Sequence, residues 1–414
     1  MSSLGAFLAS WSRACALPLL CAATSTAQPA ARPLTVTDLG TRYPISRRVS
    51  AEAEADRKTT VEHLTPATAP NAEVRYLRVY MELEKGAGGR WFLTVRDQDL
   101  RPVEVLTPES FLPGGGRWTT RVNGTRVYFD LDPLDAGPET KETRIALTEY
   151  IAMPVRAQSP YYSSQVPASP DYRDLYAGAS GGKRRLGDTV GFVMGSYDQT
   201  SWCCSGVVVG QDLLLTNWHC GGKPGLTPQN DYWSPRSCQD TIVDLSWDGD
   251  SVSREFRCTD VLCQDLDLDF ALLRMAPLGS GSAAKPAVVR RDPPVADEPL
   301  ALIHHPECLP KRITDPCHVV DAAYRGWVDA SAKVDFSHRC DTEEGSSGGA
   351  IFDERGRLVG LHHTGFAQSD DAVAKAGKFN TAVRMDRILA HLRSVGANSP
   401  ACAVGLDKLL QVEP

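Results

Sequence analysis

Alternating apolar and polar positions predict β-strands along much of the chain. Residues 74–83 alternate strongly enough for a half-buried strand, and residues 91–95 form a second apolar run after a glycine-rich turn. Residues 121–129 contain Asn123-Gly124, a dipeptide that favours the positive φ angles of a tight hairpin turn. Residues 72–156 are therefore predicted to form a small all-β module, a β-sandwich, without a cluster of catalytic residue types.

Short apolar runs between Gly, Pro and Asp positions continue from residue 188 to residue 395. They fall at 190–194, 206–209, 213–216, 270–273, 300–303 and 358–361. Many short strands with few helical periods predict a barrel or a sandwich. Residues 382–392 have apolar residues at helical spacing and are predicted to form a helix, and residues 396–414 are predicted to be an irregular C-terminal tail.

The segments outside these two domains have compositions typical of signal peptides, propeptides and linkers. Arg13 precedes a short apolar stretch, and small residues follow up to Ala27, so residues 1–27 are predicted to be a signal peptide. Residues 28–71, rich in Ala, Pro and Thr, are predicted to be a propeptide or linker. Residues 157–187 are predicted to be an exposed linker, whose run Lys183-Arg184-Arg185 is either a site of proteolytic release or a solvated group of charges.

Charge and cysteine usage narrow the cellular context. The net charge of -7 argues against nucleic acid as the main partner. No internal run is long and apolar enough to cross a bilayer. Apart from Cys15 and Cys21, all cysteines lie between Cys203 and Cys402, which predicts a disulfide set that belongs to one domain in an oxidising compartment. We therefore expect a secreted or periplasmic protein, and a monomer.

A glycine-rich turn presents the candidate nucleophile. Gly345-Ser-Ser-Gly-Gly349 stands directly before an apolar strand. The glycines permit a sharp turn that exposes the Ser347 hydroxyl and frees nearby backbone N–H groups for a developing oxyanion. Glycine- and serine-rich turns are common, so this motif alone has little specificity.

A histidine and an aspartate occupy similar positions beside other predicted strands. His219 follows the apolar run 213–215, where it would serve as a general base. Asp269 begins the strand that follows Leu268, and a buried carboxylate there needs a hydrogen-bond partner such as a histidine Nδ1. Asp265 and Asp267 are rivals that we interpret as solvated loop charges. Together the motifs occur in the order His, Asp, Ser, and this combination is far more specific than any one of them.

At these motifs the chain resembles the chymotrypsin-like (trypsin-like) serine peptidases, nearest the bacterial lysyl endopeptidase and glutamyl endopeptidase branch. The general likeness rests on Thr-Asn-Trp-His-Cys, Asp-Phe-Ala-Leu-Leu and Gly-Ser-Ser-Gly-Gly. The narrower likeness rests on Ile303-His-His-Pro306 with Lys311-Arg-Ile313, and on residues 118–124 and 127–131 of the β-module. The resemblance covers roughly residues 72–395 and implies a double β-barrel at residues 188–395, protein or peptide substrates, and neither cofactor nor metal.

The resemblance also implies roles for individual residues. His219 would be the general base, Asp269 would orient it and Ser347 would be the nucleophile. The backbone N–H groups of Gly345 and Ser347 would form the oxyanion hole. It implies a disulfide between Cys204 and Cys220 that braces the histidine loop. We also expect a bridge between Cys308 and Cys317, while the pairing of the remaining cysteines stays open.

Specificity rests on three further residues whose implications conflict. Asp341 matches the trypsin position whose carboxylate binds Lys or Arg at P1. His362 matches the histidine with which glutamyl endopeptidases bind an acidic side chain. His363 stands at a position that is usually serine and faces the triad aspartate. We expect Lys or Arg at P1, with Glu or Asp as the alternative.

Activation would differ from that of the animal enzymes. There an aspartate directly before the nucleophile pairs with the N-terminus that cleavage frees, whereas this chain has Ser346. A neutral hydroxyl cannot hold an α-ammonium group in that way. We therefore expect a zymogen in which the β-module or the linker blocks the site sterically.

Two alternatives from other functional classes remain open. One is a catalytically inactive homologue that acts as a binding module. The other is a zinc site, because several potential ligands lie close together in the sequence. These are His304, His305, Cys308, Cys317 and His318. In an exported protein the two cysteines are expected to be oxidised, which argues against the zinc site.

Overall fold

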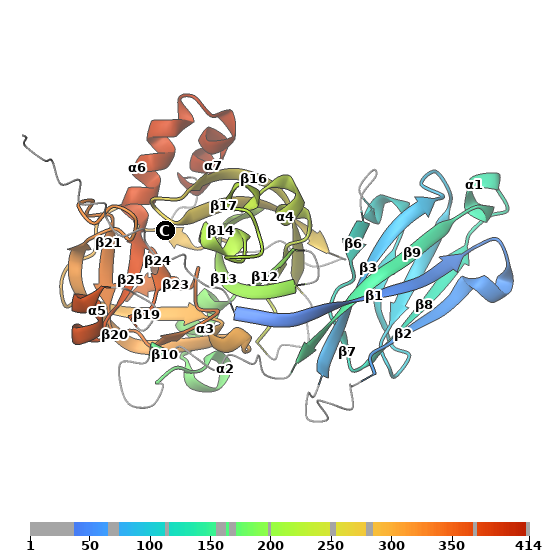
Figure 1. Cartoon of the computed structure of the whole chain (residues 1–414), viewed down its shortest axis with the longest axis horizontal. Helices are drawn as coiled ribbons and strands as arrows, with labels where there is room; N and C mark the ends of the chain where they lie inside the picture. Colours follow the sequence, from blue (N-terminus) through green and yellow to red (C-terminus); the bar gives the residue numbers. More distant parts are fainter. Residues whose placement is uncertain are drawn as a thin grey trace, which may run out of the picture. The chain divides into compact units, whose positions relative to one another are not determined.

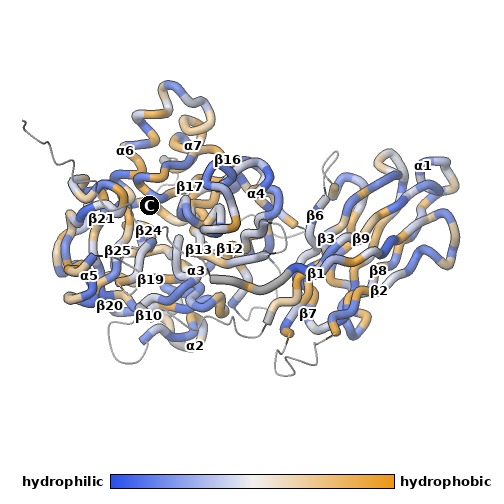
Figure 2. Tube along the Cα trace, viewed as in Figure 1, coloured by the Kyte–Doolittle hydropathy of each residue, from blue (hydrophilic) through white to orange (hydrophobic). Residues whose placement is uncertain are grey.

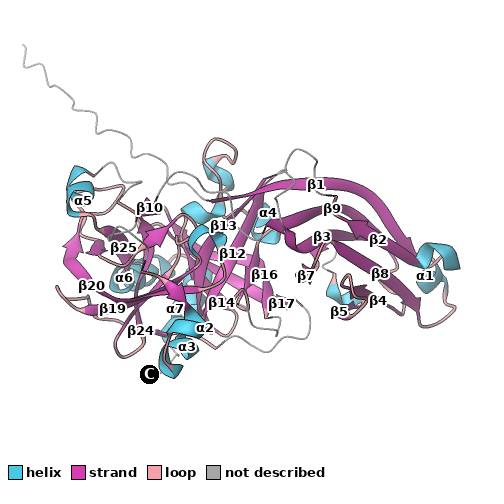
Figure 3. Ribbon diagram, turned by 90° about the horizontal axis from the view of Figure 1, so that it is seen from below, coloured by secondary structure: helices cyan, strands magenta, loops and turns pink. Residues whose placement is uncertain are grey.

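Strands are more abundant than helices in the described chain (Figure 1, Figure 3). The computed structural model describes residues 37–64, 74–111, 116–154, 163–164, 171–197, 200–248, 254–278, 285–366 and 371–410, all of which belong to the compact unit Arg32–Pro414. The predicted signal peptide lies outside these residues. Within the described ranges, none of the helices combines the length and the apolar character that a membrane span requires.

The N-terminal module consists of two sheets that share one apolar core. Side chains of both sheets, among them Val79, Leu93, Phe129 and Leu147, are fully buried in that core. The first sheet contains β1 (Thr37–Ser50), β9 (Arg144–Pro154), β3 (Val74–Lys85), β6 (Gly116–Trp118) and β7 (Val122–Asn123). The second contains β2 (Lys58–Glu62), β8 (Arg126–Pro133), β4 (Trp91–Arg96) and β5 (Pro102–Leu106). Short helices lie in the connections: η1 (Glu54–Arg57), η2 (Pro108–Ser110) and α1 (Pro138–Lys141).

Strand β1 joins this module to the domain that follows. Residues 42–50 pair with β9, and residues 37–41 pair with β13. Residues 28–71 were interpreted above as a propeptide or linker, but β1 and β2 fall within this range. Few of the described side chains of β1 are buried, so its apolar pattern is weak. The strand is held by its backbone pairing with β9 and β13.

Two closed six-stranded β-barrels follow, which confirms the predicted double-barrel fold. The first contains β12 (Val190–Tyr197), β13 (Thr200–Gly210), β14 (Leu213–Thr216), β17 (Phe270–Leu278), β16 (Glu255–Asp265) and β15 (Ile242–Asp244), which pairs back to β12. The second contains β19 (Pro299–His304), β20 (Arg312–Tyr324), β21 (Asp335–His338), β25 (Asn380–Arg384), β24 (Arg357–Thr364) and β23 (Ala350–Asp353), which pairs back to β19. The parallel strand β18 (Val288–Val289) adds to β24. Hydrophobic residues occur along strands of both barrels (Figure 2).

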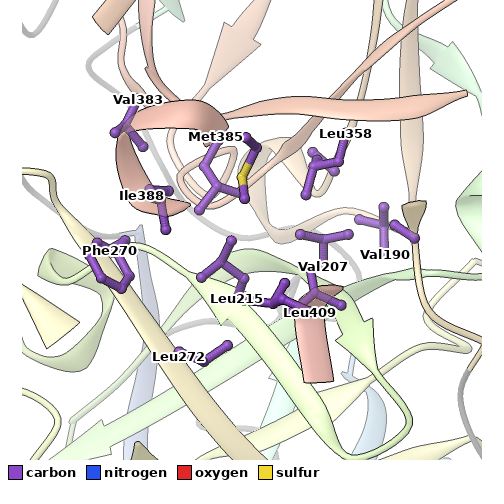
Figure 4. Packing of buried hydrophobic residues seen from close by; sticks show 14 of the residues in the cluster. Val190, Val207, Leu215, Phe270, Leu272, Leu358, Val383, Met385, Ile388 and Leu409 are labelled. Carbon is purple, nitrogen blue, oxygen red and sulfur yellow. The ribbon is translucent and has the colours of Figure 1, made fainter. Parts of the chain in front are cut away.

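One apolar core extends across both barrels. Leu215 and Leu272 of the first barrel belong to the same buried cluster as Val383 and Ile388, which come from β25 and from helix α6 (Met385–Gly396) (Figure 4). Helix α6 corresponds to the helix predicted at residues 382–392, except that residues 382–384 belong to β25. The remaining short helices of this domain are η3 (His219–Gly221), η4 (Gln229–Asp231), α4 (Pro235–Gln239), η5 (Pro306–Cys308) and α5 (Ala372–Gly377).

The C-terminal tail differs from the prediction. Residues 400–410 form helix α7 (Pro400–Leu410), and Leu409 is buried in the shared core. A disulfide from Cys402 to Cys263 ties the helix to the first barrel. Cys402, Leu406 and Leu409 recur at helical spacing, a short signal that the irregular-tail interpretation overlooked.

The predicted linker 157–187 also contains ordered elements. These are β10 (Ser163–Ser164), β11 (Arg173–Asp174), α2 (Leu175–Gly178) and α3 (Gly181–Gly187). Strand β10 pairs with β22 (Thr342–Glu343), and β11 pairs with β20. The basic run Lys183-Arg184-Arg185 lies inside α3, where Lys183 forms an ion pair with Asp315. This part of the chain therefore packs against the second barrel.

Five disulfides connect the cysteines of the barrel domain, as the cysteine distribution predicts. The pairs are Cys203–Cys308, Cys204–Cys220, Cys238–Cys258, Cys263–Cys402 and Cys317–Cys340. The Cys204–Cys220 pair is the one that the family resemblance implies. The expected Cys308–Cys317 bridge is wrong: Cys308 lies in the η5 turn, whereas strand β20 places Cys317 opposite Leu300 and beside Cys340.

Candidate active site

His219 and Asp269 come together because their strands are neighbours. Strands β14 and β17 pair with Thr216 opposite Ala271, so the turn after β14 lies beside the turn before β17. His219 Nδ1 lies 2.8 Å from Asp269 Oδ2, and the His219 backbone N–H donates to Oδ1 at 2.9 Å. Asn217 donates its side-chain amide to the Asp269 carbonyl at 2.9 Å, which supports the left-handed backbone of Asp269 at φ 46°.

The electrostatics of this pair favour an ionised carboxylate. Both side chains are buried. Burial alone would raise the pKa of Asp269, but the electrostatic interaction and hydrogen bond with His219, followed by those with His363, outweigh burial and lower it. His219 Nε2 is buried and has no hydrogen-bond partner among the described residues. The second ring nitrogen is therefore available to act on a hydroxyl.

Ser205 of β13 holds the loop that carries Ser347. Its backbone N–H donates to the Ser347 carbonyl at 2.7 Å, and its Oγ donates to the Gly345 carbonyl at 2.9 Å. Its own carbonyl accepts a hydrogen bond from Thr216 Oγ1 at 2.7 Å. Thr216 ends the strand that leads to His219, so Ser205 links the serine loop to the histidine loop. Sequence reasoning missed Ser205, which no motif marks.

The loop backbone requires its glycines. Gly345 has φ 90° and Gly348 has φ 79°. A Cβ on Gly348 would lie 2.0 Å from the Ser205 carbonyl oxygen, so a larger residue would displace β13. Across the parts of the chain that the structure describes, the N–H groups of Gly345 and Ser347 form no hydrogen bond. Two free amides beside a hydroxyl are the donors that an oxyanion needs.

The three candidate specificity residues differ in their surroundings. Asp341 is buried, and its Oδ2 accepts the Asp171 backbone N–H at 2.9 Å. His362 exchanges backbone hydrogen bonds with the loop: its carbonyl accepts the Gly348 N–H, and its N–H donates to the Gly349 carbonyl. Its Nδ1 lies 3.3 Å from His338 Nε2. Burial, and after it the neighbouring His338, holds the pKa of His362 well below its usual value, so the ring is neutral.

His363 lies between two buried carboxylates. Its Nε2 is 3.0 Å from Asp335 Oδ2 of β21, and its Nδ1 is 3.4 Å from Asp269 Oδ2. Burial opposes the ring charge, but the charge of Asp335, followed by the contacts with Asp269, raises the pKa of His363 to about 10. His363 is thus a cation beside Asp269. Sequence reasoning had no signal for Asp335.

The cysteines near these histidines are unavailable to a metal. Cys204, Cys220 and His219 offer ligand atoms within 4.8 Å of one another, but the two sulfurs are bonded to each other. In the zinc alternative, Cys308 and Cys317 belong to separate disulfides. Disulfide sulfur cannot supply the thiolate that a zinc site uses, so neither ligand set is usable in this oxidised state.

Fold and local geometry together define a trypsin-like double barrel with an acid–imidazole pair beside a serine loop. Residues 204–361 match the sequence family described as a trypsin-like peptidase domain. That range contains His219, Asp269 and Ser347. Residues 204–361 are therefore similar to a trypsin-like peptidase domain.

Other comparisons are more distant. A search of curated proteins finds no match. Among solved structures, an inactive form of Rv3671c from M. tuberculosis has a TM-score of 0.39 and 18% identity, covering 56% of this chain and 98% of that one. The active form of the same protease has a TM-score of 0.37 and 18% identity, covering 58% and 94%. A serine endoprotease from Yersinia pestis has a TM-score of 0.37 and 16% identity, covering 52% and 66%.

Proposed function

We propose that this protein is an exported serine endopeptidase with His219, Asp269 and Ser347 as its catalytic triad. The observation that carries the proposal is the contact of His219 Nδ1 with Asp269, which leaves Nε2 without a partner among the described residues. An imidazole held in this tautomer is a general base that needs only a hydroxyl to act on. Ser347 supplies that hydroxyl in our proposal.

The chemistry proceeds by acyl transfer. His219 Nε2 accepts the proton of Ser347 Oγ as the oxygen attacks the scissile carbonyl carbon, and Asp269 stabilises the imidazolium that results. The proton then passes from Nε2 to the leaving amine, and the Oγ–acyl bond remains. Water, deprotonated by the same imidazole, hydrolyses that ester and returns the proton to Ser347.

The oxyanion receives the N–H groups of Gly345 and Ser347. Their freedom from other hydrogen bonds supports this role. One such donor typically contributes about 10²- to 10³-fold to kcat, because it is already oriented toward the oxygen on which charge develops. Ser205 supports the same role, since it holds both carbonyls that flank Ser346.

For specificity we propose Lys or Arg at P1, bound by the carboxylate of Asp341. The alternative, Glu or Asp at P1, is favoured by His362, whose backbone is bonded to Gly348 and Gly349 of the serine loop. Asp341 Oδ2 already accepts the Asp171 N–H, so a Lys or Arg side chain at P1 must share that oxygen with the amide. The narrower lysyl or glutamyl endopeptidase relationship belongs to this proposal as well.

Export through the signal peptide at residues 1–27 and a monomeric state complete the proposal. Five disulfides support export, since such bonds persist mainly in oxidising compartments. Protein or peptide substrates follow from the peptidase domain.

Labelling with a fluorophosphonate probe tests the nucleophile. We expect covalent labelling of the purified protein and its loss in Ser347→Ala, and mass spectrometry of the labelled peptide should place the label on Ser347 and not on Ser346. Correctly folded protein that resists the probe would support the binding-module alternative.

A panel of fluorogenic peptides with Lys, Arg, Glu or Phe at P1 tests specificity. Asp341→Asn should lose turnover of the basic substrates selectively if Asp341 binds them. His362→Gln should lose turnover of the acidic substrate selectively if the alternative holds.

A further inference from the structure

Ser346, the residue before the proposed nucleophile, turns its side chain into the protein. It is fully buried, and its backbone N–H donates to the Glu343 carbonyl at 3.0 Å. The Ser346 carbonyl accepts the Gly349 N–H at 2.8 Å. The C=O and N–H of a trans peptide point in opposite directions, so this bond directs the Ser347 N–H to the other side. The orientation of one proposed oxyanion donor thus depends on the peptide of Ser346.

His304, at the end of β19, binds the Ser346 hydroxyl. Ser346 Oγ lies 2.8 Å from His304 Nδ1 and accepts the Glu343 N–H at 3.0 Å. His304 Nε2 lies 3.5 Å from Thr314 Oγ1, which donates to the Asp341 carbonyl at 3.1 Å. One proton arrangement satisfies every contact: Ser346 donates to Nδ1, and His304 carries its proton on Nε2.

The imidazole of His304 suits this arrangement because it is neutral. Burial, and after it the neighbouring His305 and His338, holds the pKa of His304 well below its usual value. A protonated ring would have no lone pair for the Ser346 hydroxyl. The bond therefore persists throughout the neutral and mildly acidic range.

Residues 171–174 cover this network from the N-terminal side. The ring of Tyr172 meets that of His304 edge-on, with centroids 5.8 Å apart and an interplanar angle of 87°. The Asp171 N–H donates to Asp341, and β11 pairs with β20. This segment precedes the basic run Lys183–Arg185, so it occupies its place in a chain that has not been cut there.

We propose that Ser346 and His304 are positioning residues that hold the serine loop in its oxyanion-binding conformation in the uncleaved chain. The inference rests on the proposed function of Ser347. It replaces the ion pair of the animal enzymes with a hydroxyl–imidazole bond that needs no freed N-terminus. A zymogen form would then be inactive because substrate cannot reach the site, while the serine loop already has its oxyanion-binding conformation.

The test uses the full chain with its linker intact and a small fluorophosphonate that can pass a steric shield. We expect the wild-type chain to be labelled while its mass still corresponds to uncut protein. The kinetic comparison is Ser346→Ala against Ser346→Thr, measured as kcat and KM with a small peptide amide and normalised by active-site titration. Ser346→Ala should lower kcat by roughly 10²-fold with little change in KM, the effect expected for a misdirected oxyanion donor, and Thr should restore most of it.

Ser196→Ala provides the matched control. Ser196 is buried and its hydroxyl bonds Ser201 at 3.1 Å, so this variant also loses one buried hydrogen bond. It should keep the wild-type kcat, which separates a positioning effect from a general loss of stability. Labelled wild type together with an unchanged kcat in folded Ser346→Ala would overturn the inference alone. Wild type that is neither labelled nor active would overturn the proposed function and the inference with it.

Discussion

Replacing His363 by Gln should destabilise the protein in a way that depends on pH. His363 contacts Asp335 at 3.0 Å and Asp269 at 3.4 Å, and all three side chains are buried. Glutamine keeps much of the volume and the capacity to donate hydrogen bonds, but it cannot carry a positive charge. The substitution therefore removes the cation and leaves the two carboxylates.

The magnitude follows from the raised pKa of His363. A shift from 6.5 to about 10 means that folding favours the protonated ring by about 5 kcal/mol. Because the folded pKa lies above the unfolded one, this stabilisation is complete below about pH 6.5 and is lost as the pH rises through 10. Roughly 3 kcal/mol remains near pH 8, and less than about 1 kcal/mol near pH 10.

Denaturant unfolding with the disulfides intact measures this contribution. A Ser347→Ala background prevents self-digestion, and free energies of unfolding with and without His363→Gln are compared near pH 6, 8 and 10. The gap should shrink by several kcal/mol across that range. His391→Gln is the control, because His391 is partly exposed and lies 3.7 Å from a single carboxylate, that of Asp265. A gap that stays constant with pH would refute the cationic assignment.

Three further outcomes are expected. Asp269→Asn should lower kcat by about 10⁴-fold, as measured with a peptide amide, because the amide favours the wrong histidine tautomer; a loss of less than about tenfold would contradict the triad. Arg78→Met should cost about 3–5 kcal/mol of unfolding free energy, because it leaves the buried carboxylates of Glu255 and Asp244 without that cation. The control is Arg48→Met at an exposed ion pair with Glu84, which should cost less than about 1 kcal/mol. Stability should fall below about pH 6.5, by up to roughly 1.4 kcal/mol per pH unit for each buried neutral histidine, because the unfolded chain binds protons that the folded chain excludes. Among the described residues, the buried histidines with a lowered pKa are His63, His304, His305, His338 and His362, and an unfolding free energy that is constant between pH 6 and pH 4 would count against their neutrality.

The fold and the His219–Asp269 neighbourhood could be predicted from sequence because local patterns encode both. Alternation marks individual strands, and each motif residue sits at the end of one. The pairing of β14 with β17 then brings His219 to Asp269. An error of one or two residues in a predicted strand boundary still leaves the motif residue close to the end of that strand, so the motifs could locate the candidate site from sequence.

Contacts between non-adjacent strands could not be predicted in the same way. Asp335 is on β21 and His363 is on β24, and β25 lies between these two strands in the sheet. Their meeting depends on the curvature of a closed barrel, which no periodicity records. The expected Cys308–Cys317 disulfide was wrong for a related reason. Cys317 lies on β20, next to Cys340, so its closeness to Cys308 in sequence did not predict its partner. Strand β1 was missed because its apolar pattern is weak.

The charge balance around Asp269 explains how a histidine can replace the usual serine at position 363. A lone cation there would offset the negative charge that stabilises an imidazolium on His219 in the acyl transfer that we propose. Asp335 supplies the compensating charge at 3.0 Å. Burial raises the pKa of Asp335, but the raised pKa of His363 keeps the proton on the ring, so Asp335 and His363 together form an ion pair without net charge. Asp269 therefore keeps a net charge of about one unit for His219, as it would beside a neutral serine.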